Sequence, residues 1–363
     1  MRLHLLSIPH TVTRKDFSHC AFTGKVQRFG PMLRAEGFHV IHYGVEGAVS
    51  GASEDVELLS TEEHLALLGV SAYHTSEARF VGADARADSP VYQQFNYYLR
   101  DALRERLQPK DVVCLPFGFA HDAAWRDLEL ITSGQVTVVE TGIGYPEPFS
   151  LHRIYESQAW RHWMMGKEGR GGQDWDTVRR EWVIPNYYDV NDWELGPGHS
   201  NRVVYFGRIT DVKGCGLIPR LAVERPDLEF VLCGQGDPAP YLTAPNIHYV
   251  PPVHGDERAA LLGNARASLH PSRFVEPFCG AAVEAMLCGT PAVTSNFGAF
   301  TETVLDGVTG RRCAFATQDW SRALDEVAVL SRPRIRELAV SRYSMKAIGP
   351  QYAQVFNQIR DAH

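Results

Sequence analysis

The sequence predicts an α/β protein made of two Rossmann-like domains, each with a parallel sheet. Short apolar runs alternate with amphipathic stretches along the chain, as strands alternate with helices in such folds. The alternation starts again after a segment of glycine, proline and polar residues at 196–201. The length of 363 residues suits two or three domains of ordinary size. We therefore expect an N-terminal domain at 1–190 and a C-terminal domain at 191–345.

The expected elements of the N-terminal domain follow from its apolar pattern. Strands are predicted at residues 3–8, 40–43, 111–115 and 136–140. Helices are predicted at residues 25–36, 65–68, 92–107 and 147–165. Gly37 follows the first of these helices, where a C-cap glycine is expected.

The C-terminal domain shows the same alternation. Strands are predicted at residues 203–206, 228–233, 247–250, 267–270 and 291–294. Helices are predicted at residues 214–224, 256–264 and 279–288. Strands and helices in this order favour parallel pairing with right-handed crossovers.

Composition excludes several classes of protein. The chain has 36 basic and 43 acidic residues, a net charge of −7, so no global positive field draws it to nucleic acid or anionic lipid. Its seven cysteines include no C-x-x-C pair, which indicates a reduced chain without a disulfide framework or zinc site. No apolar run approaches the ~20 residues that span a bilayer. We expect a cytoplasmic protein without a membrane span.

Two carboxylates flank the start of one predicted helix in the C-terminal domain. Glu276 precedes the helix and Glu284 lies inside it, so both can face one ligand. Paired carboxylates can accept hydrogen bonds from the vicinal hydroxyls of a sugar. The N–H groups of Phe278, Cys279 and Gly280 lie at the positive end of the helix dipole. The stretch predicts a site for a sugar or an anion.

A second polar cluster follows the predicted strand at 203–206. Gly207 forms a turn after the strand, and Arg208 and Lys213 come next. Arginine binds phosphate oxygens through two parallel hydrogen bonds, and lysine acts as a point charge. Together they would stabilise negative charge that grows on a leaving diphosphate.

The motifs in these stretches resemble those of a known family. Gly-Arg-x4-Lys-Gly occurs at 207–214, Glu-x7-Glu at 276–284 and Val-Ile-Pro-Asn at 183–186. Together they resemble the retaining GT-B glycosyltransferases of the family four type. The resemblance covers residues 183–360 and implies the GT-B fold, in which two Rossmann-like domains face an interdomain cleft. It also implies that a helix at 346–363 completes the N-terminal domain.

The resemblance implies a role for each matched residue. Arg208 and Lys213 would bind the diphosphate of a nucleoside-diphosphate sugar. Glu284 would hold its ribose, and Glu276 would hold the donor sugar. The other donor-binding candidates are Gly207, Val253 beside the base, Gly24 in a glycine loop at the first helix, and the N–H groups of Phe278, Cys279 and Gly280.

The activity implied is the transfer of a sugar to a hydroxyl acceptor with retention of anomeric configuration. UDP-glucose is the first donor to consider, as a co-substrate, and we expect neither a cofactor nor a metal. Asp174 and Asp176 form an Asp-x-Asp pair, but they lie in a glycine-rich segment instead of at a strand end. We therefore do not predict a metal site there.

The N-terminal half supplies further candidates. His10 follows the first strand, at the edge where α/β sites lie, and completes the catalytic set. Glu140, Gly142 and Tyr145 belong to a strand-end turn that is expected to line the cleft on the acceptor side. Arg153 is a further acceptor-side candidate, although its three-residue spacing to a glutamate on the predicted helix also allows the two to pair.

Two other functions stay open. Segments such as 140–145 and 153–157 also resemble transferases carried in phage genomes, some of which glycosylate 5-hydroxymethylpyrimidines in DNA. A basic and aromatic segment at 160–182 could hold a phosphate backbone and a flipped base, whereas the acidic balance favours another hydroxyl acceptor. The other alternative is a protein that binds a nucleotide sugar without transferring it.

Overall fold

The computed structural model divides the chain into two compact units. It describes residues 1–363 except 19, 74–85, 171–179, 199–200, 315 and 362–363. Unit 1 comprises Met1–Glu156, Met164–Tyr187 and Met345–His363. Unit 2 comprises Ser157–Trp163 and Tyr188–Ser344. The first and last segments of the chain thus belong to the same unit.

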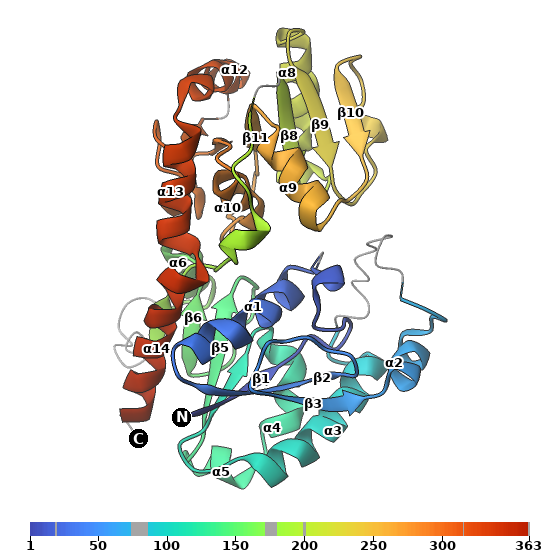
Figure 1. Ribbon diagram of the computed structural model, residues 1–363, viewed down its shortest axis with the longest axis vertical. Helices are drawn as coiled ribbons and strands as arrows, with labels where there is room; N and C mark the ends of the chain where they lie inside the picture. Colours follow the sequence, from blue (N-terminus) through green and yellow to red (C-terminus); the bar gives the residue numbers. More distant parts are fainter. Residues whose placement is uncertain (19, 74–85, 171–179, 199–200, 315, 362–363) are drawn as a thin grey trace. The chain divides into compact units, whose positions relative to one another are not determined.

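Unit 1 contains a seven-stranded parallel sheet in the order β3-β2-β1-β4-β5-β6-β7 (Figure 1). The strands are β1 Arg2–Leu6, β2 His39–Val45, β3 Glu54–Leu59, β4 Val112–Leu115, β5 Thr137–Ile143, β6 His152–Tyr155 and β7 Glu181–Val183. The helices are α1 Ala21–Ala35, α2 Thr61–Leu68, α3 Pro90–Arg106, α4 Asp122–Trp125, α5 Glu129–Thr132 and α14 Met345–Asp361.

Helices cover both faces of this sheet. Successive strand residues point to opposite faces, and apolar residues on each face pack against helices. Leu5 of β1 packs in a cluster with α1 and α14, which lie against each other, while Leu6 packs with α3 on the other face. β4 is buried at all four positions, as a strand in a sheet covered on both sides must be. The short β-branched runs that predicted parallel strands in the sequence are explained by this arrangement.

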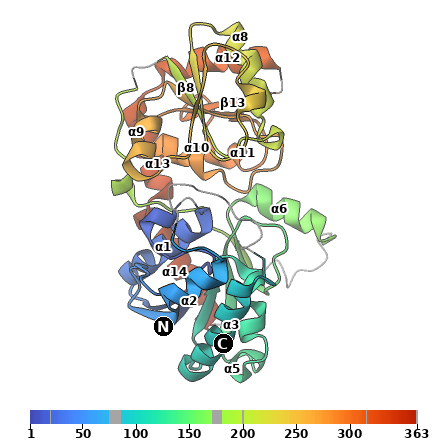
Figure 2. The same cartoon turned by 90° about the vertical axis from the view of Figure 1, so that its right-hand side faces the viewer.

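Unit 2 contains a six-stranded parallel sheet in the order β10-β9-β8-β11-β12-β13. The strands are β8 Arg202–Phe206, β9 Glu229–Cys233, β10 Ile247–Val250, β11 Ala267–His270, β12 Ala292–Ser295 and β13 Gly310–Cys313. The helices are α8 Ile218–Glu224, α9 Gly255–Gly263, α10 Gly280–Leu287, α11 Phe300–Thr303, α12 Thr317–Glu326 and α13 Arg332–Tyr343. Helices α8 and α12 cover one face, and α9, α10 and α13 cover the other (Figure 2).

The prediction of one helix over 147–165 is wrong. Residues His152–Tyr155 form β6, which pairs with β5 and β7, and α6 begins only at Gln158 and runs to Lys167. Pro146 and Pro148 disfavour a helix before β6, since proline lacks the N–H that a helix interior needs. Ile154 and Tyr155 are then buried in the sheet.

Besides β6, three strands were not expected from the sequence, and all are short or polar. β3 alternates half-buried and exposed residues at the edge of its sheet and carries acidic side chains. β7 and β13 have three and four residues and also lie at sheet edges. No helix in the described ranges combines the length and the apolarity needed to cross a membrane.

Candidate functional site

The candidate donor residues of unit 2 gather at one edge of its sheet. β9, β8 and β11 are neighbours and parallel, so their carboxyl ends lie together. Gly207 and Arg208 follow β8 directly, and the Oη atom of Tyr205 donates to the Arg208 carbonyl at 2.5 Å, which fixes this turn. The Arg208 side chain is exposed, and no ion pair to its guanidinium is found among the described residues.

The loop after β8 is joined to the loop after β11 by backbone contacts. Gly214 has a φ of +81°, and a Cβ atom there would lie 1.9 Å from the Pro271 carbonyl oxygen, so only glycine fits. The Arg273 N–H donates to the Val212 carbonyl at 2.9 Å. Phe274 places its ring centre 4.4 Å from the Lys213 Nζ atom, a cation–aromatic contact.

Lys213 and Glu276 meet within this pair of loops. The Lys213 Nζ atom donates to Glu276 Oε1 at 2.7 Å. The Glu276 side chain is 5% exposed and the Lys213 side chain is 21% exposed. The carboxylate is therefore buried, and the lysine is partly accessible to solvent. The ion pair compensates the charge of a carboxylate that is largely removed from water. The two residues that the sequence assigned to diphosphate and sugar are thus in direct contact.

The start of α10 lies next to this pair. Cys279 is the N-cap residue and has a φ of +66°, which is rare for a residue other than glycine. A Cβ on Gly280 would lie 2.7 Å from the Tyr188 Oη atom, so a larger residue here would displace that hydroxyl group. Phe278 is buried in the core, so that only its backbone could contact a ligand.

Two buried groups beneath the helix start are held in their uncharged forms. Burial and, next, the charge of Lys213 lower the pKa of His270 to about 3. Burial and, next, the charge of Glu276 raise the pKa of the Cys279 thiol to about 12. The Cys279 Sγ atom lies 3.8 Å from His270 Nδ1. Because the thiolate is the reactive form of cysteine, Cys279 is a poor nucleophile here.

Glu284 and Val253 complete the set of donor candidates in unit 2. Glu284 lies inside α10 and forms an ion pair with Arg258 of α9, a partner that sequence analysis did not identify. The loop with Val253 lies beside the end of β9, because the Cys233 thiol donates to the Pro251 carbonyl at 3.3 Å. Val253 is half-buried.

In unit 1, His10 follows β1 and is held by buried neighbours. Its Nδ1 atom lies 3.2 Å from the Tyr92 Oη atom. Burial raises the pKa of Tyr92 well above its ordinary value, so the phenol keeps its proton. Sequence analysis did not foresee that His64 and His121 bind the carbonyls of Pro9 and Ser7, at 2.7 and 2.9 Å. These two imidazoles fix the loop that carries His10.

The family resemblance implied that Gly24 belongs to a glycine loop, and this is wrong. Gly24 lies in α1, and its N–H donates to the Cys20 carbonyl at 3.0 Å, so this donor is already used. Lys25, the next residue, forms a buried ion pair with Glu156 and donates to the Gly142 carbonyl at 3.1 Å. This contact was not predicted, because the two partners are 131 residues apart.

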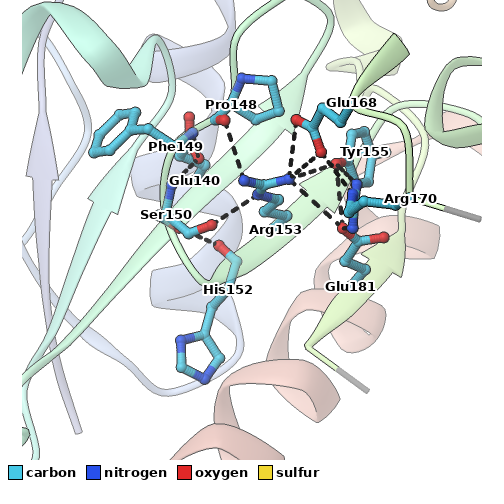
Figure 3. Close-up of polar contacts among 10 residues, drawn as sticks. All are labelled: Glu140, Pro148, Phe149, Ser150, His152, Arg153, Tyr155, Glu168, Arg170 and Glu181. Atoms are coloured by element: carbon cyan, nitrogen blue, oxygen red, sulfur yellow. Dashed lines mark hydrogen bonds and ion pairs between the residues drawn. The ribbon is translucent and has the colours of Figure 1, made fainter. Parts of the chain in front are cut away.

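Glu140 and Tyr145 do not line an open surface. Glu140 is fully buried, and its carboxylate accepts from the Tyr145 hydroxyl at 2.7 Å. The same carboxylate accepts from the N–H groups of Phe149 and Ser150 at 2.9 and 2.7 Å (Figure 3). A fully satisfied buried carboxylate stabilises its loop. The expectation that these two side chains face an acceptor is therefore wrong. Gly142 is also buried, with a φ of +66°.

Arg153 is on β6, so the predicted helical pair with Glu156 does not form. Its guanidinium binds Glu168 at 3.1 Å, lies 3.7 Å from Glu181 and donates to the Ser150 and Pro148 carbonyls at 2.7 and 3.1 Å (Figure 3). Buried arginine with this many partners holds the loop before β6 in place.

Comparison with known proteins shows which proteins the C-terminal part of the chain resembles. Residues 200–330 match the sequence profile of the family described as glycosyl transferases group 1. The chain is 30% identical over 197 residues to glycogen synthase of Mycobacterium tuberculosis, which covers 48% of this chain and 47% of that protein. It is 30% identical over 146 residues to phosphatidyl-myo-inositol mannosyltransferase of Propionibacterium freudenreichii, covering 38% and 37%. The chain spans about half the length or less of the curated relatives it matches.

A solved structure extends the likeness to the whole chain. A glycosyltransferase involved in avilamycin A biosynthesis superposes with a TM-score of 0.70 at 18% identity, over 100% of this chain and 99% of the other. Residues 200–330 therefore resemble the group 1 glycosyltransferases, and the whole chain has the GT-B fold. The profile match contains every candidate donor residue from Gly207 to Glu284 and none of those in unit 1.

The basic and aromatic segment at 160–182 is partly neutralised. Arg170 forms ion pairs with Glu168 and Glu181, which also bind Arg153 (Figure 3). The Trp160 side chain is buried, and its ring stacks on that of Trp163 with centres 4.5 Å apart. The segment at 171–179, which includes Asp174, Asp176 and part of the basic run, lies outside the described residues. Within the described ranges, no cluster of three or more histidine, cysteine or acidic side chains could hold a metal ion.

Proposed function

We propose that this chain is a glycosyltransferase that moves a sugar from a nucleoside-diphosphate sugar to a hydroxyl acceptor, with retention of configuration and without a divalent metal. The observation that carries the proposal is the Lys213–Glu276 ion pair, which lies between the Gly207–Arg208 turn and the start of α10 inside the family match. The family four resemblance supports retention. The activity of the whole chain is part of this proposal.

The proposed site would bind the diphosphate through cations. The exposed Arg208 guanidinium and the Lys213 ammonium would neutralise the charge that grows on the leaving diphosphate. The N–H groups at the start of α10 would add the positive end of the helix dipole. Fixed cations of this kind can do the work that a bound metal ion does in other transferases.

Glu276 would accept hydrogen bonds from the hydroxyls of the donor sugar. The bond between the anomeric carbon and the diphosphate oxygen would break, and the acceptor oxygen would attack the same face. The acceptor proton would pass to the leaving phosphate oxygen, so no protein nucleophile is required. Cys279 is held as a thiol and is therefore a poor nucleophile, which is consistent with a mechanism that uses no protein nucleophile.

UDP-glucose is the proposed donor. HepE of Anabaena, which is 16% identical with a TM-score of 0.67 over 98% of this chain and 99% of that chain, was solved in complex with UDP and glucose. At this identity the likeness supports the fold, and the bound molecules name the first donor to test. Its complex with UDP-glucose supports the same choice.

A hydroxyl of a sugar or polyol is the proposed acceptor. The names of two relatives include inositol, which is a polyol. A DNA acceptor is the weaker candidate, because the chain has a net charge of −7 and Arg170 is already paired with Glu181.

The test is a release assay for UDP with UDP-glucose as donor. The purified chain is given inositol, glucose oligomers, or DNA with and without 5-hydroxymethylcytosine, and Lys213→Ala serves as the inactive control. Release that depends on a polyol or glucan, with the product in the retained configuration, supports the proposal. Release that requires the modified DNA would establish the alternative acceptor. Binding of UDP-glucose without release on any acceptor would favour a protein that only binds the nucleotide sugar.

A further inference from the structure

Arg258 lies outside the recognised motifs, yet it binds a residue of one of them. It lies on α9 and forms an ion pair with Glu284 of α10, 26 residues further along the chain. The Arg258 and Glu284 side chains are 17% and 11% exposed, so water competes little for either charge. In this setting the pair is held more firmly than an exposed one would be.

Aromatic rings fix the Arg258 guanidinium from other directions. Its Cζ atom lies 4.1 Å from the ring centre of Phe206 and 5.9 Å from that of Trp193. Such contacts favour a planar cation. Phe206 is the last residue of β8 and directly precedes the turn at Gly207 and Arg208. Arg258 therefore connects the end of β8 with a carboxylate on α10.

The ion pair engages only one carboxylate oxygen of Glu284. Arg258 binds Oε2. The Oε1 atom lies 3.7 Å from the position that a Cβ of Gly280 would occupy, so it points toward the first turn of α10. No hydrogen bond to Oε1 is found in the described part of the chain. Oε1 is thus an acceptor that faces the helix start, on the side of the proposed donor site.

We propose that Arg258 is a positioning residue that keeps Glu284 oriented, so that Oε1 accepts a hydrogen bond from the ribose of the donor nucleotide. This inference rests on the proposed function, which assigns Glu284 to the ribose. Without Arg258, the carboxylate of Glu284, which is 8% exposed as a whole residue, would lose its partner and turn toward water. Arg258 acts through Glu284 and does not itself contact the nucleotide.

The experiment measures the affinity of the full chain for UDP and for 2′,3′-dideoxy-UDP, which lacks both ribose hydroxyls. Arg258→Met should bind UDP about tenfold more weakly than the wild type and dideoxy-UDP within about twofold of it. Arg258→Lys, which keeps the charge but not the planar guanidinium, should recover only part of the UDP affinity. Arg258→Met combined with Glu284→Gln should bind UDP no more weakly than Glu284→Gln alone. Arg220→Met, an exposed site on α8, is the matched control and should bind both nucleotides as the wild type does.

Each other outcome contradicts a defined part of the argument. Equal losses for UDP and dideoxy-UDP in Arg258→Met would mean that Arg258 supports the fold of the site or contacts the diphosphate, and the proposal would be wrong. Wild-type UDP affinity in Arg258→Met, with a loss in Glu284→Gln, would overturn the role of Arg258 alone. A wild-type chain that binds neither nucleotide would instead overturn the proposed donor site.

Discussion

The Lys213 ammonium donates to the Glu276 carboxylate at 2.7 Å, although 63 residues separate them in sequence. In the proposed mechanism, the first contacts a diphosphate and the second a sugar, yet without a ligand they satisfy each other. The diphosphate must therefore compete with Glu276 for Lys213. Binding and catalysis then depend on Glu276 in opposite directions.

Glu276→Gln should bind free UDP more tightly and transfer more slowly. Removal of the carboxylate charge frees Lys213 for the diphosphate, for a gain of about fivefold, or about 1 kcal/mol. Loss of the charged acceptor for the donor sugar should lower transfer by about 10²-fold. Titration with UDP and a UDP-release assay measure the two effects. Weaker UDP binding in Glu276→Gln would show that the carboxylate orients Lys213 instead of competing for it.

Arg208→Ala and Lys213→Ala should differ in stability while both lose activity. Each should lower the transfer rate by about 10²-fold, since each removes a cation from the leaving diphosphate. Lys213→Ala also leaves the buried Glu276 unpaired, at a cost of about 2 kcal/mol in unfolding free energy. Arg208 is exposed, so its replacement should change that free energy by less than about 0.5 kcal/mol. Thermal melts measure the change in stability, and a UDP-release assay measures the transfer rate. Wild-type turnover in both variants would refute the assignment of these two cations to the diphosphate.

Gly214→Ala should separate the two loops of the donor site. The added methyl would lie 1.9 Å from the Pro271 carbonyl oxygen, and the φ of +81° adds strain, for a cost of about 3 kcal/mol. UDP affinity should fall with stability. Gly37→Ala is the matched control, because its φ is +85° and nothing lies within 4 Å of the added methyl. It should cost only about 1 kcal/mol and leave UDP binding intact. Similar effects of both substitutions on UDP binding would contradict the loop contact.

Glu140→Gln should destabilise unit 1 without affecting the donor. The amide cannot accept all of the hydrogen bonds from Tyr145, Phe149 and Ser150, and a loss of about 2 kcal/mol is expected. Glu147→Gln, at an exposed position in the same loop, is the control and should be neutral. Hydrogen exchange of the amides at 149 and 150 reports the loosened loop. An unchanged exchange rate there would mean that the carboxylate does not hold it.

Acid should destabilise both units through buried histidines. Burial lowers the pKa of His64 to about 4 and that of His270 to about 3, from an ordinary value of 6.5. Below pH 6.5 the unfolded chain binds protons that the folded chain does not, so stability falls with pH. The expected slope is about 1.4 kcal/mol per pH unit for each histidine, down to its folded pKa. His64→Gln should flatten the melting profile of the protein between pH 6 and about 4. A profile as steep as that of the wild type would contradict the neutral state of His64.

Sequence analysis predicted the features that depend on local residue patterns. Apolar runs such as that of β4 predicted the parallel strands, and the family motifs predicted the fold and the set of donor candidates. It could not find contacts between distant residues, such as Arg258 with Glu284, because an arginine on a helix usually faces solvent. The prediction for Glu140 was wrong for a related reason. A glutamate at a strand end can face a ligand or accept hydrogen bonds from a buried loop, and only the folded structure shows which of the two occurs.

The central claim is that the diphosphate of a sugar nucleotide binds at the Lys213–Glu276 pair. Calorimetric titration of UDP into the wild type and into Lys213→Ala tests this most directly. The account predicts saturable binding to the wild type and an affinity at least about tenfold lower for Lys213→Ala, with Arg220→Met unchanged. Equal affinity of the wild type and Lys213→Ala for UDP would contradict it.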